Sequence, residues 1–194
     1  MAAYQGIAAV SLTLRDMLRE LYPQSGLGSA LNAELYQTKD FASPMKEGIA
    51  LFLWRVAPNL NRRNPGQRID AQGNRLRPAL PVDLSYLLVP FAEDADRQQR
   101  LLGWMLRTME DLGTLMASRL NNAVADADVF TTDEALEVVF DPLSISDHLT
   151  LWDRIKAMPL YASYTIRMLM IDSSIRISEG PLVTERAFQL GVLK

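Results

Sequence analysis

The one histidine of the sequence, His148, directly follows an acid, Asp147. A serine hydrolase needs a histidine that an acid orients and that accepts the proton of the serine hydroxyl. Neighbouring residues of a helix point about 100° apart, so Asp147 is badly placed to orient the His148 ring. The sequence also lacks the G-x-S-x-G turn that presents a nucleophilic serine. We therefore interpret His148 as a solvated or core-edge residue, and keep a small hydrolase that uses it as an alternative.

Patterns for cofactors and metals are incomplete. Gly26 and Gly28 begin like a dinucleotide fingerprint, but the third glycine position holds Leu31, and the pair follows a predicted helix where the motif needs a strand. The chain has no cysteine, which removes thiolate nucleophiles and cysteine-based zinc sites. No group of histidines and carboxylates has metal-ligand spacing. The sequence therefore predicts no catalytic residues, no cofactor and no metal.

A cluster of arginines follows the first strongly apolar stretch. Residues 55–77 contain six arginines and one acid, Asp70. The arginines are Arg55, Arg62, Arg63, Arg68, Arg75 and Arg77. Prolines and glycines interrupt the segment and no apolar period survives, so we predict a long basic loop over residues 57–78. Loops of this length in a compact domain are usually functional or disordered.

The basic loop has three interpretations: a phosphate-binding surface, a solvated loop and a protein contact. It has no aromatic side chain to stack on bases, and the chain carries a net charge of -3, so nucleic acid remains only an alternative partner. Arginine is enriched at protein interfaces, and its planar guanidinium pairs with carboxylates. We predict a protein contact made by Arg62, Arg63, Arg68, Arg75 and Arg77.

Hydrophobic periodicity predicts the elements that position this loop. Apolar residues from Ile7 to Leu21 recur at helical spacing. Residues 48–56 are apolar on both faces almost to their end, as in a strand covered on both sides. Alternation over residues 82–89 predicts a second strand, and Pro90 should end it because proline has no N–H to donate.

A long central helix should follow this second strand. Glu93, Asp94 and Asp96 precede it, where the exposed N–H groups of a helix start favour negative charge. Its apolar stripe, which we expect in the core, consists of Leu101, Met105, Met109, Leu112 and Met116.

The second half of the chain predicts two more strands and a short helix. Residues 118–133 suggest a flexible loop, and residues 136–140 alternate as a third strand. Ser144 begins a capping-box pattern for a short helix over residues 146–157. We expect this helix to bury Leu149, Trp152 and Ile155. Residues 161–171 alternate again, and one face of this strand should carry Tyr164, Ile166, Met168 and Met170.

Length and composition predict a single α+β domain over residues 1–194, since 48% of the 194 residues are apolar and 22% are charged. We expect one mixed or mostly antiparallel sheet of about four to five strands, packed with the N-terminal helix, the long central helix and the short helix. No apolar run approaches the ~20 residues that cross a bilayer, and no signal peptide is recognisable. We therefore predict no membrane partner, and the absence of cysteine fits a reducing cytoplasm.

The order of several short pieces carries a further signal. They read I-A-A-V-x-x-x-L, W-R-V-x-P-N, R-P-x-L-P-V-D-L-S-Y-L-L-V-P, R-L-L-G-W-M-L-R-T-M, L-W-D-R-I, P-L-Y-x-S-Y-T-I-R-M-L-M-I-D-S and P-L-V-T-E-R. From Gly6 to Arg186, the chain resembles the tail-cap, or tail-terminator, proteins of extracellular contractile injection systems. These are phage-tail-like particles of the antifeeding-prophage and virulence-cassette types.

The resemblance implies an α+β terminator fold without catalytic residues. It also implies a hexameric ring that caps the inner tube and sheath at the end distal to the baseplate. Such a protein would assemble in the cytoplasm and then become part of a particle that lysis releases. A closed ring needs contacts between two different patches of one chain. We therefore expect the basic loop of one subunit to meet an acidic surface of its neighbour.

Overall fold

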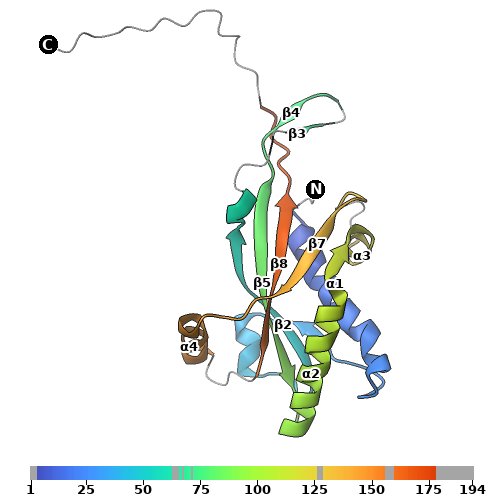
Figure 1. Cartoon of the computed structure of the whole chain (residues 1–194), viewed down its shortest axis with the longest axis vertical. Helices are drawn as coiled ribbons and strands as arrows, with labels where there is room; N and C mark the ends of the chain where they lie inside the picture. The colour runs from blue at the N-terminus through green and yellow to red at the C-terminus, as the bar shows by residue number, and fades with distance from the viewer. Residues whose placement is uncertain are drawn as a thin grey trace, which may run out of the picture.

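The computed structural model describes residues 4–62, 66, 68–70, 72–125, 129–155 and 160–177. Its six-stranded sheet has the order β1-β2-β5-β8-β7-β6 (Figure 1). These strands are β1 (Ala33–Leu35), β2 (Gly48–Pro58), β5 (Leu80–Phe91), β8 (Ala162–Ile171), β7 (Ala135–Phe140) and β6 (Thr114–Met116). Strands β1 and β2 are parallel, and the other described pairs of this sheet are antiparallel. The predicted α+β fold is confirmed, with six strands in place of about four to five.

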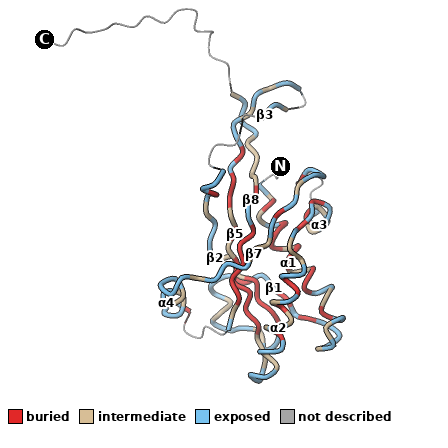
Figure 2. The backbone as a smooth tube through the Cα atoms, viewed as in Figure 1, coloured by how far each residue is buried: buried red, intermediate tan, exposed pale blue. Residues whose placement is uncertain are grey.

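Three helices lie on one face of the sheet: α1 (Gly6–Leu21), α2 (Ala95–Leu112) and α3 (Ala117–Asn122). The predicted N-terminal helix is thus confirmed, and its residues Val10 and Leu14 are fully buried. Strand β5 supplies every second residue to the same core cluster, namely Val82, Leu84, Tyr86 and Leu88. Figure 2 shows buried residues concentrated where these helices meet the strands.

The opposite face of the sheet is apolar at one end and polar at the other. Leu87 and Val89 belong to a second core cluster, which side chains from α4 (Ile145–Arg154) and the 3-10 helix η2 (Thr38–Ala42) help to cover. Asp83 lies earlier on the same side of β5, beyond this cluster. This division explains why the sequence of β5 has apolar side chains on both faces only in its second half.

Helix α4 begins where predicted but packs differently. The Ser144 hydroxyl accepts the Asp147 N–H at 3.1 Å, which confirms the capping residue. Ile155 is buried as expected, whereas Leu149 and Trp152 are exposed, so the prediction that they enter the core is wrong. The helix contacts the second core cluster through Leu151 instead, and this turns Leu149 and Trp152 outward.

Helix α2 begins at an acid and ends at a glycine. Asp94 caps it by accepting the Arg97 N–H at 2.8 Å. Met105 and Met109 are buried, so the expected core stripe is confirmed along the helix itself. The stripe does not reach Met116, because Gly113 adopts a left-handed φ of 54° and ends the helix. Met116 lies in β6 with an exposed side chain, which corrects the prediction.

Pro90 does not end β5, which continues to Phe91. Pro90 stands opposite Ile49 of β2, and the Ile49 N–H points away from this pair to the Asn32 carbonyl at 2.8 Å. In an antiparallel ladder such a pair exchanges no hydrogen bonds, so the missing proline N–H costs none. On the other side of β5, the last residue that β8 pairs is Leu88. The prediction failed because it assumed a ladder bond at Pro90.

A β-bulge changes the faces of β8. Its register with β5 shifts between Val82 and Leu84, where Asp83 faces two residues of β8. The second of them, Met168, has a φ of 62° and an exposed side chain. Leu169 therefore turns into the core, and the expectation that Met168 and Met170 share the face of Tyr164 and Ile166 is wrong.

The predicted loop over residues 118–133 is partly structured, because α3 occupies its beginning. In the last turn of α3, Asn121 exchanges two hydrogen bonds with the backbone of Phe130, at 2.8 and 2.9 Å. The Phe130 side chain is buried in the main core cluster. The turn after α3 is thus fixed by a side-chain amide and an aromatic anchor; residues 126–128 lie outside the described residues.

Two glycine substitutions should affect stability in opposite directions. Gly48 has a φ of 145°, and an added Cβ would lie 2.2 Å from the Asn32 carbonyl oxygen, so Gly48→Ala should lower the free energy of unfolding by at least about 2 kcal/mol. Gly103 lies on the exposed side of α2 with no atom within 4 Å of an added Cβ, so Gly103→Ala should raise it by about 0.5–1 kcal/mol. Urea unfolding of both variants measures the two changes in the free energy of unfolding. Changes of the same sign and size would contradict the described geometry.

Candidate assembly interface

The predicted basic loop contains a hairpin that projects beyond the end of the sheet (Figure 1). Strands β3 (Arg68–Ile69) and β4 (Arg75–Leu76) pair antiparallel. The chain after β8 runs beside β4, since the Arg77 N–H reaches the Ile175 carbonyl at 2.9 Å and the Ile177 N–H reaches the Arg75 carbonyl at 2.8 Å. We call β3, β4 and residues 173–177 the arm. Three chain segments thus order part of a region that was predicted as a loop.

The one acid of the arm hairpin is used within its turn. The carboxylate of Asp70 accepts the side-chain amide of Asn74 at 2.8 Å and the backbone N–H groups of Gln72 and Asn74 at 2.9 and 2.7 Å. The Asn74 side-chain bond, followed by the backbone bonds, holds the pKa of Asp70 below its ordinary value. Asp70 therefore stays ionised, and its carboxylate is already occupied within the turn.

The structure places the predicted arginines in different settings. Arg68 forms an ion pair with Asp172 at the end of β8, so it helps to hold the arm to the sheet. Arg75 and Arg77 lie on β4 and directly after it, and both are exposed. Arg62 lies at the base of the arm, in the 3-10 helix η3 (Leu60–Arg62), and is also exposed. No carboxylate among the described residues is within ion-pair distance of Arg62 or Arg77, and Arg63 lies outside them.

A side-chain network that sequence reasoning missed fixes the base of the arm. The amide nitrogen of Asn59 donates to both carboxylate oxygens of Asp83, at 2.9 and 3.0 Å. Its amide oxygen accepts the N–H groups of Asn61 and Arg62, at 3.0 and 3.1 Å. Asp83 also accepts the N–H of Met168 at 2.9 Å. The network therefore joins the β8 bulge to the segment that presents Arg62.

Exposed apolar side chains accompany these arginines. Ile69 and Ile175 of the arm are 67% and 52% exposed, and Leu60 and Leu80 near its base are 80% and 53% exposed. Large apolar side chains gathered with arginine are typical of protein interfaces. A nucleic-acid surface would instead need aromatic or polar groups to meet the bases. The arm therefore has the chemistry of a protein contact.

Among the described residues, the side-chain partners of His148 are aromatic and not an acid or a serine. Its Nδ1 is hydrogen-bonded to the Tyr161 hydroxyl, and its ring lies 5.5 Å from that of Trp152. The Asp147 carboxylate accepts the Ser144 hydroxyl at 2.8 Å and belongs to the helix cap. Histidine, acid and serine therefore serve local structure, as the core-edge interpretation of His148 expects.

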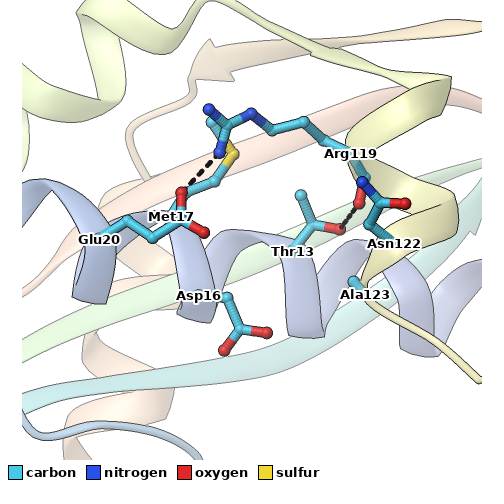
Figure 3. A pocket seen from close by; sticks show the side chains of 7 residues that line it. All are labelled: Thr13, Asp16, Met17, Glu20, Arg119, Asn122 and Ala123. Atoms are coloured by element: carbon cyan, nitrogen blue, oxygen red, sulfur yellow. Dashed lines mark hydrogen bonds and ion pairs between the residues drawn. The ribbon is translucent and has the colours of Figure 1, made fainter.

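A hollow of about 160 Å³ between α1 and α3 is lined by polar groups (Figure 3). Glu20 accepts Arg119 at 2.7 Å across the hollow, and Asp16 accepts Arg15 at 2.7 Å. The Thr13 hydroxyl donates to the Arg119 carbonyl at 3.5 Å. The contacts of Arg119 thus join α3 to α1 across the hollow. Because Asp16 and Glu20 already pair with arginines, neither acid lining the hollow is free to act as a base.

The strongest pKa shifts belong to buried phenols. Burial raises the pKa of Tyr164 to about 12 and moves that of Tyr86 still further upward. Tyr86 shares a hydrogen bond of 2.7 Å with Ser11 of α1, so it ties helix to sheet. Among the described residues, no group of three or more histidines and carboxylates could hold a metal ion. Within the same residues, no helix has both the length and the apolarity that spanning a bilayer requires.

Two solved structures share this fold. The chain is similar to the sheath/tube terminator of an extracellular contractile injection system, PVC, in the extended state, with 13% identity and a TM-score of 0.63 over 97% of this chain and 65% of that one. It is also similar to the tube-terminating cap of the anti-feeding prophage, with 15% identity and a TM-score of 0.60 over 93% of this chain and 60% of that one. The chain thus spans about two thirds of the length of these proteins.

Sequence comparison gives a family match. The family described as the Pvc16 N-terminal domain matches residues 9–185, which cover most of α1, every described strand and the arm. No curated protein sequence matches the chain.

The network around the buried Asn59 side chain should contribute measurably to the stability of the fold. Asn59→Ala removes both bonds to Asp83 and frees the N–H groups of Asn61 and Arg62, so it should lower the free energy of unfolding by about 1–3 kcal/mol. The matched control is Asn61→Ala, whose exposed side chain takes no part in the network and should cost less than about 0.5 kcal/mol. Urea unfolding of the two variants measures the difference in stability. A similar loss of unfolding free energy in both would show that the Asn59 network does not stabilise the fold.

Proposed function

The chain belongs to the Pvc16 N-terminal domain family, and we propose that it is a structural cap of a contractile, phage-tail-like injection particle. It ends the tube and sheath at the end distal to the baseplate. The observation that carries this proposal is the fold shared with a sheath/tube terminator over 97% of the chain. The cap acts as a structural protein and not as an enzyme, in keeping with the local roles of His148, Asp147 and Ser144.

To stop the growth of a stacked polymer, the last ring must lack the surface that binds a further ring. Each ring of an open stack offers the next ring the same unsatisfied surface, so addition continues without limit. A terminator must match that surface on one side and offer nothing that tube or sheath subunits recognise on the other. We propose that this chain does so as a homo-oligomer, a hexameric ring, with the inner tube and sheath proteins as its partners. Assembly takes place in the cytoplasm, and the finished particle leaves the cell at lysis.

The arginines of the arm region are the proposed assembly contacts: Arg62, Arg63, Arg68, Arg75 and Arg77. We propose that these arginines have two different roles. Arg62 and Arg77 are exposed, without an ion-pair partner among the described residues, and can meet carboxylates of another subunit. Arg68 acts by holding the arm in place through Asp172. The proposal thus separates cations that make contacts from a cation that positions them.

Deleting the gene for this chain from its particle system should uncouple tail length from its control. Cells without the cap should yield few intact particles, and the survivors should vary in length or lack the sheath, because nothing ends polymerisation. Length distributions from electron micrographs give the measurement, and restoring the gene should restore a narrow distribution. Deletion particles as abundant and as uniform as those of the parent strain would refute the proposed function.

A further inference from the structure

Helix α4 carries apolar side chains on two faces, and only one of them is covered. Leu151 and the following Ile155 pack against the second core cluster. On another face, Ile145, Leu149 and Trp152 are 81%, 59% and 53% exposed. Spacings of four and three residues place these three side chains in one stripe along the helix. We call Ile145, Leu149 and Trp152 the outer stripe.

The outer stripe has the properties of a contact surface. A tryptophan flanked by aliphatic side chains is typical of the centre of a protein interface. Surface hydrophobic residues that stand alone need no explanation, but a continuous stripe usually marks a binding site. The stripe is also held rigidly, because Ser144 caps the helix and Tyr161 binds His148 on the neighbouring turn.

The charge around the outer stripe is negative. Residues 141–155 contain three aspartates and one arginine. Asp147 and Asp153 are exposed, and no cation among the described residues is within ion-pair distance of either. The partner that fits this surface is therefore apolar with a basic rim.

The arm offers the complementary surface on the same chain. Its exposed apolar residues are Ile69 and Ile175, and Arg77 beside them has no carboxylate partner within the described part of the chain. Two acids of the described residues near the arm are occupied, Asp70 in the turn and Asp172 with Arg68. The arm lies beyond one end of the sheet, whereas α4 lies at the side of the other half (Figure 1). The two surfaces therefore cannot meet within one copy.

We propose that the arm of one copy packs on the outer stripe of α4 on the next copy. Apolar groups then meet apolar groups, and Arg77, which directly follows the arm strand β4, faces Asp147 and Asp153. Two different patches in contact make a head-to-tail interface, the kind that closes a ring. The proposal rests on the proposed ring and names the surfaces that form it.

The absence of cysteine in the chain permits a direct test by crosslinking. Copies carrying Ile69→Cys and copies carrying Leu149→Cys are produced together in the particle-forming cells, and assembled particles are treated with a short bis-maleimide. We expect a conjugate of twice the chain mass that contains one copy of each variant. Neither variant alone should give it. The matched control pairs Ile69→Cys with Gln99→Cys, an exposed position on α2, and should give no conjugate.

A second pair of variants tests the stripe itself. Trp152→Glu should lower the yield of the conjugate by about tenfold or more. Thr150→Glu, at an exposed position on the same helix but off the stripe, should leave it unchanged. Unaltered urea midpoints show that both variants fold.

Failure of this inference differs from failure of the proposed function. If particles carrying both cysteine variants have normal lengths but give no conjugate, the interface is wrong and the cap stands. A conjugate between Leu149→Cys and the tube or sheath protein, or between two Leu149→Cys copies, also overturns the interface. If deletion of the gene leaves particle length unchanged, the proposed function fails whatever the crosslinking shows.

Discussion

The Asp83 carboxylate is the interaction on which the interface region depends. It holds a bulged strand on one side, through the Met168 N–H, and the start of the arm on the other, through Asn59. Bonds from donors to an ionised acceptor are stronger than bonds between neutral groups. Met168 adopts a left-handed backbone that costs of order 1–2 kcal/mol for a residue with a side chain, and the carboxylate offsets part of that cost. Through these bonds the carboxylate links the bulge of β8 to Asn59, whose amide oxygen accepts the Arg62 N–H.

The division of the sheet follows from the same strand. Strand β5 is central, with β2 and β8 on its two sides, so its side chains decide what each face can bind. Leu87 and Val89 attract η2 and α4 to one half of the outer face, while Asp83 and Ser85 keep the other half polar. On the opposite face, side chains of α1, α2 and α3 pack into the main core cluster with those of the sheet. The arm at one end and the partly covered outer face leave large apolar side chains exposed, which is the kind of surface that protein contacts use.

Local signals in the sequence predicted the residues of the core well. They did not predict the positions where pairing with a distant strand changes the local structure. The alternation of Val82, Leu84 and Tyr86 and the cap at Asp94 were readable because each depends on neighbouring residues alone. Pro90 and Met168 were misjudged because their roles depend on register, that is, on which residue of another strand stands opposite. The outward turn of Trp152 has a related cause. An amphipathic helix with apolar residues on two faces does not reveal from its sequence which face meets the sheet.

The sequence shows the amino-acid composition of the candidate interface but not its geometry. The excess of arginine between residues 55 and 77 indicated a contact region, yet the ion pair of Arg68 with Asp172 joins residues far apart in sequence. The most direct test of the proposed cap is to locate the protein on the particle. A gold label on a tag fused to this chain should appear in electron micrographs at one end of each particle, opposite the baseplate. Label along the whole sheath, or at the baseplate, would contradict the account.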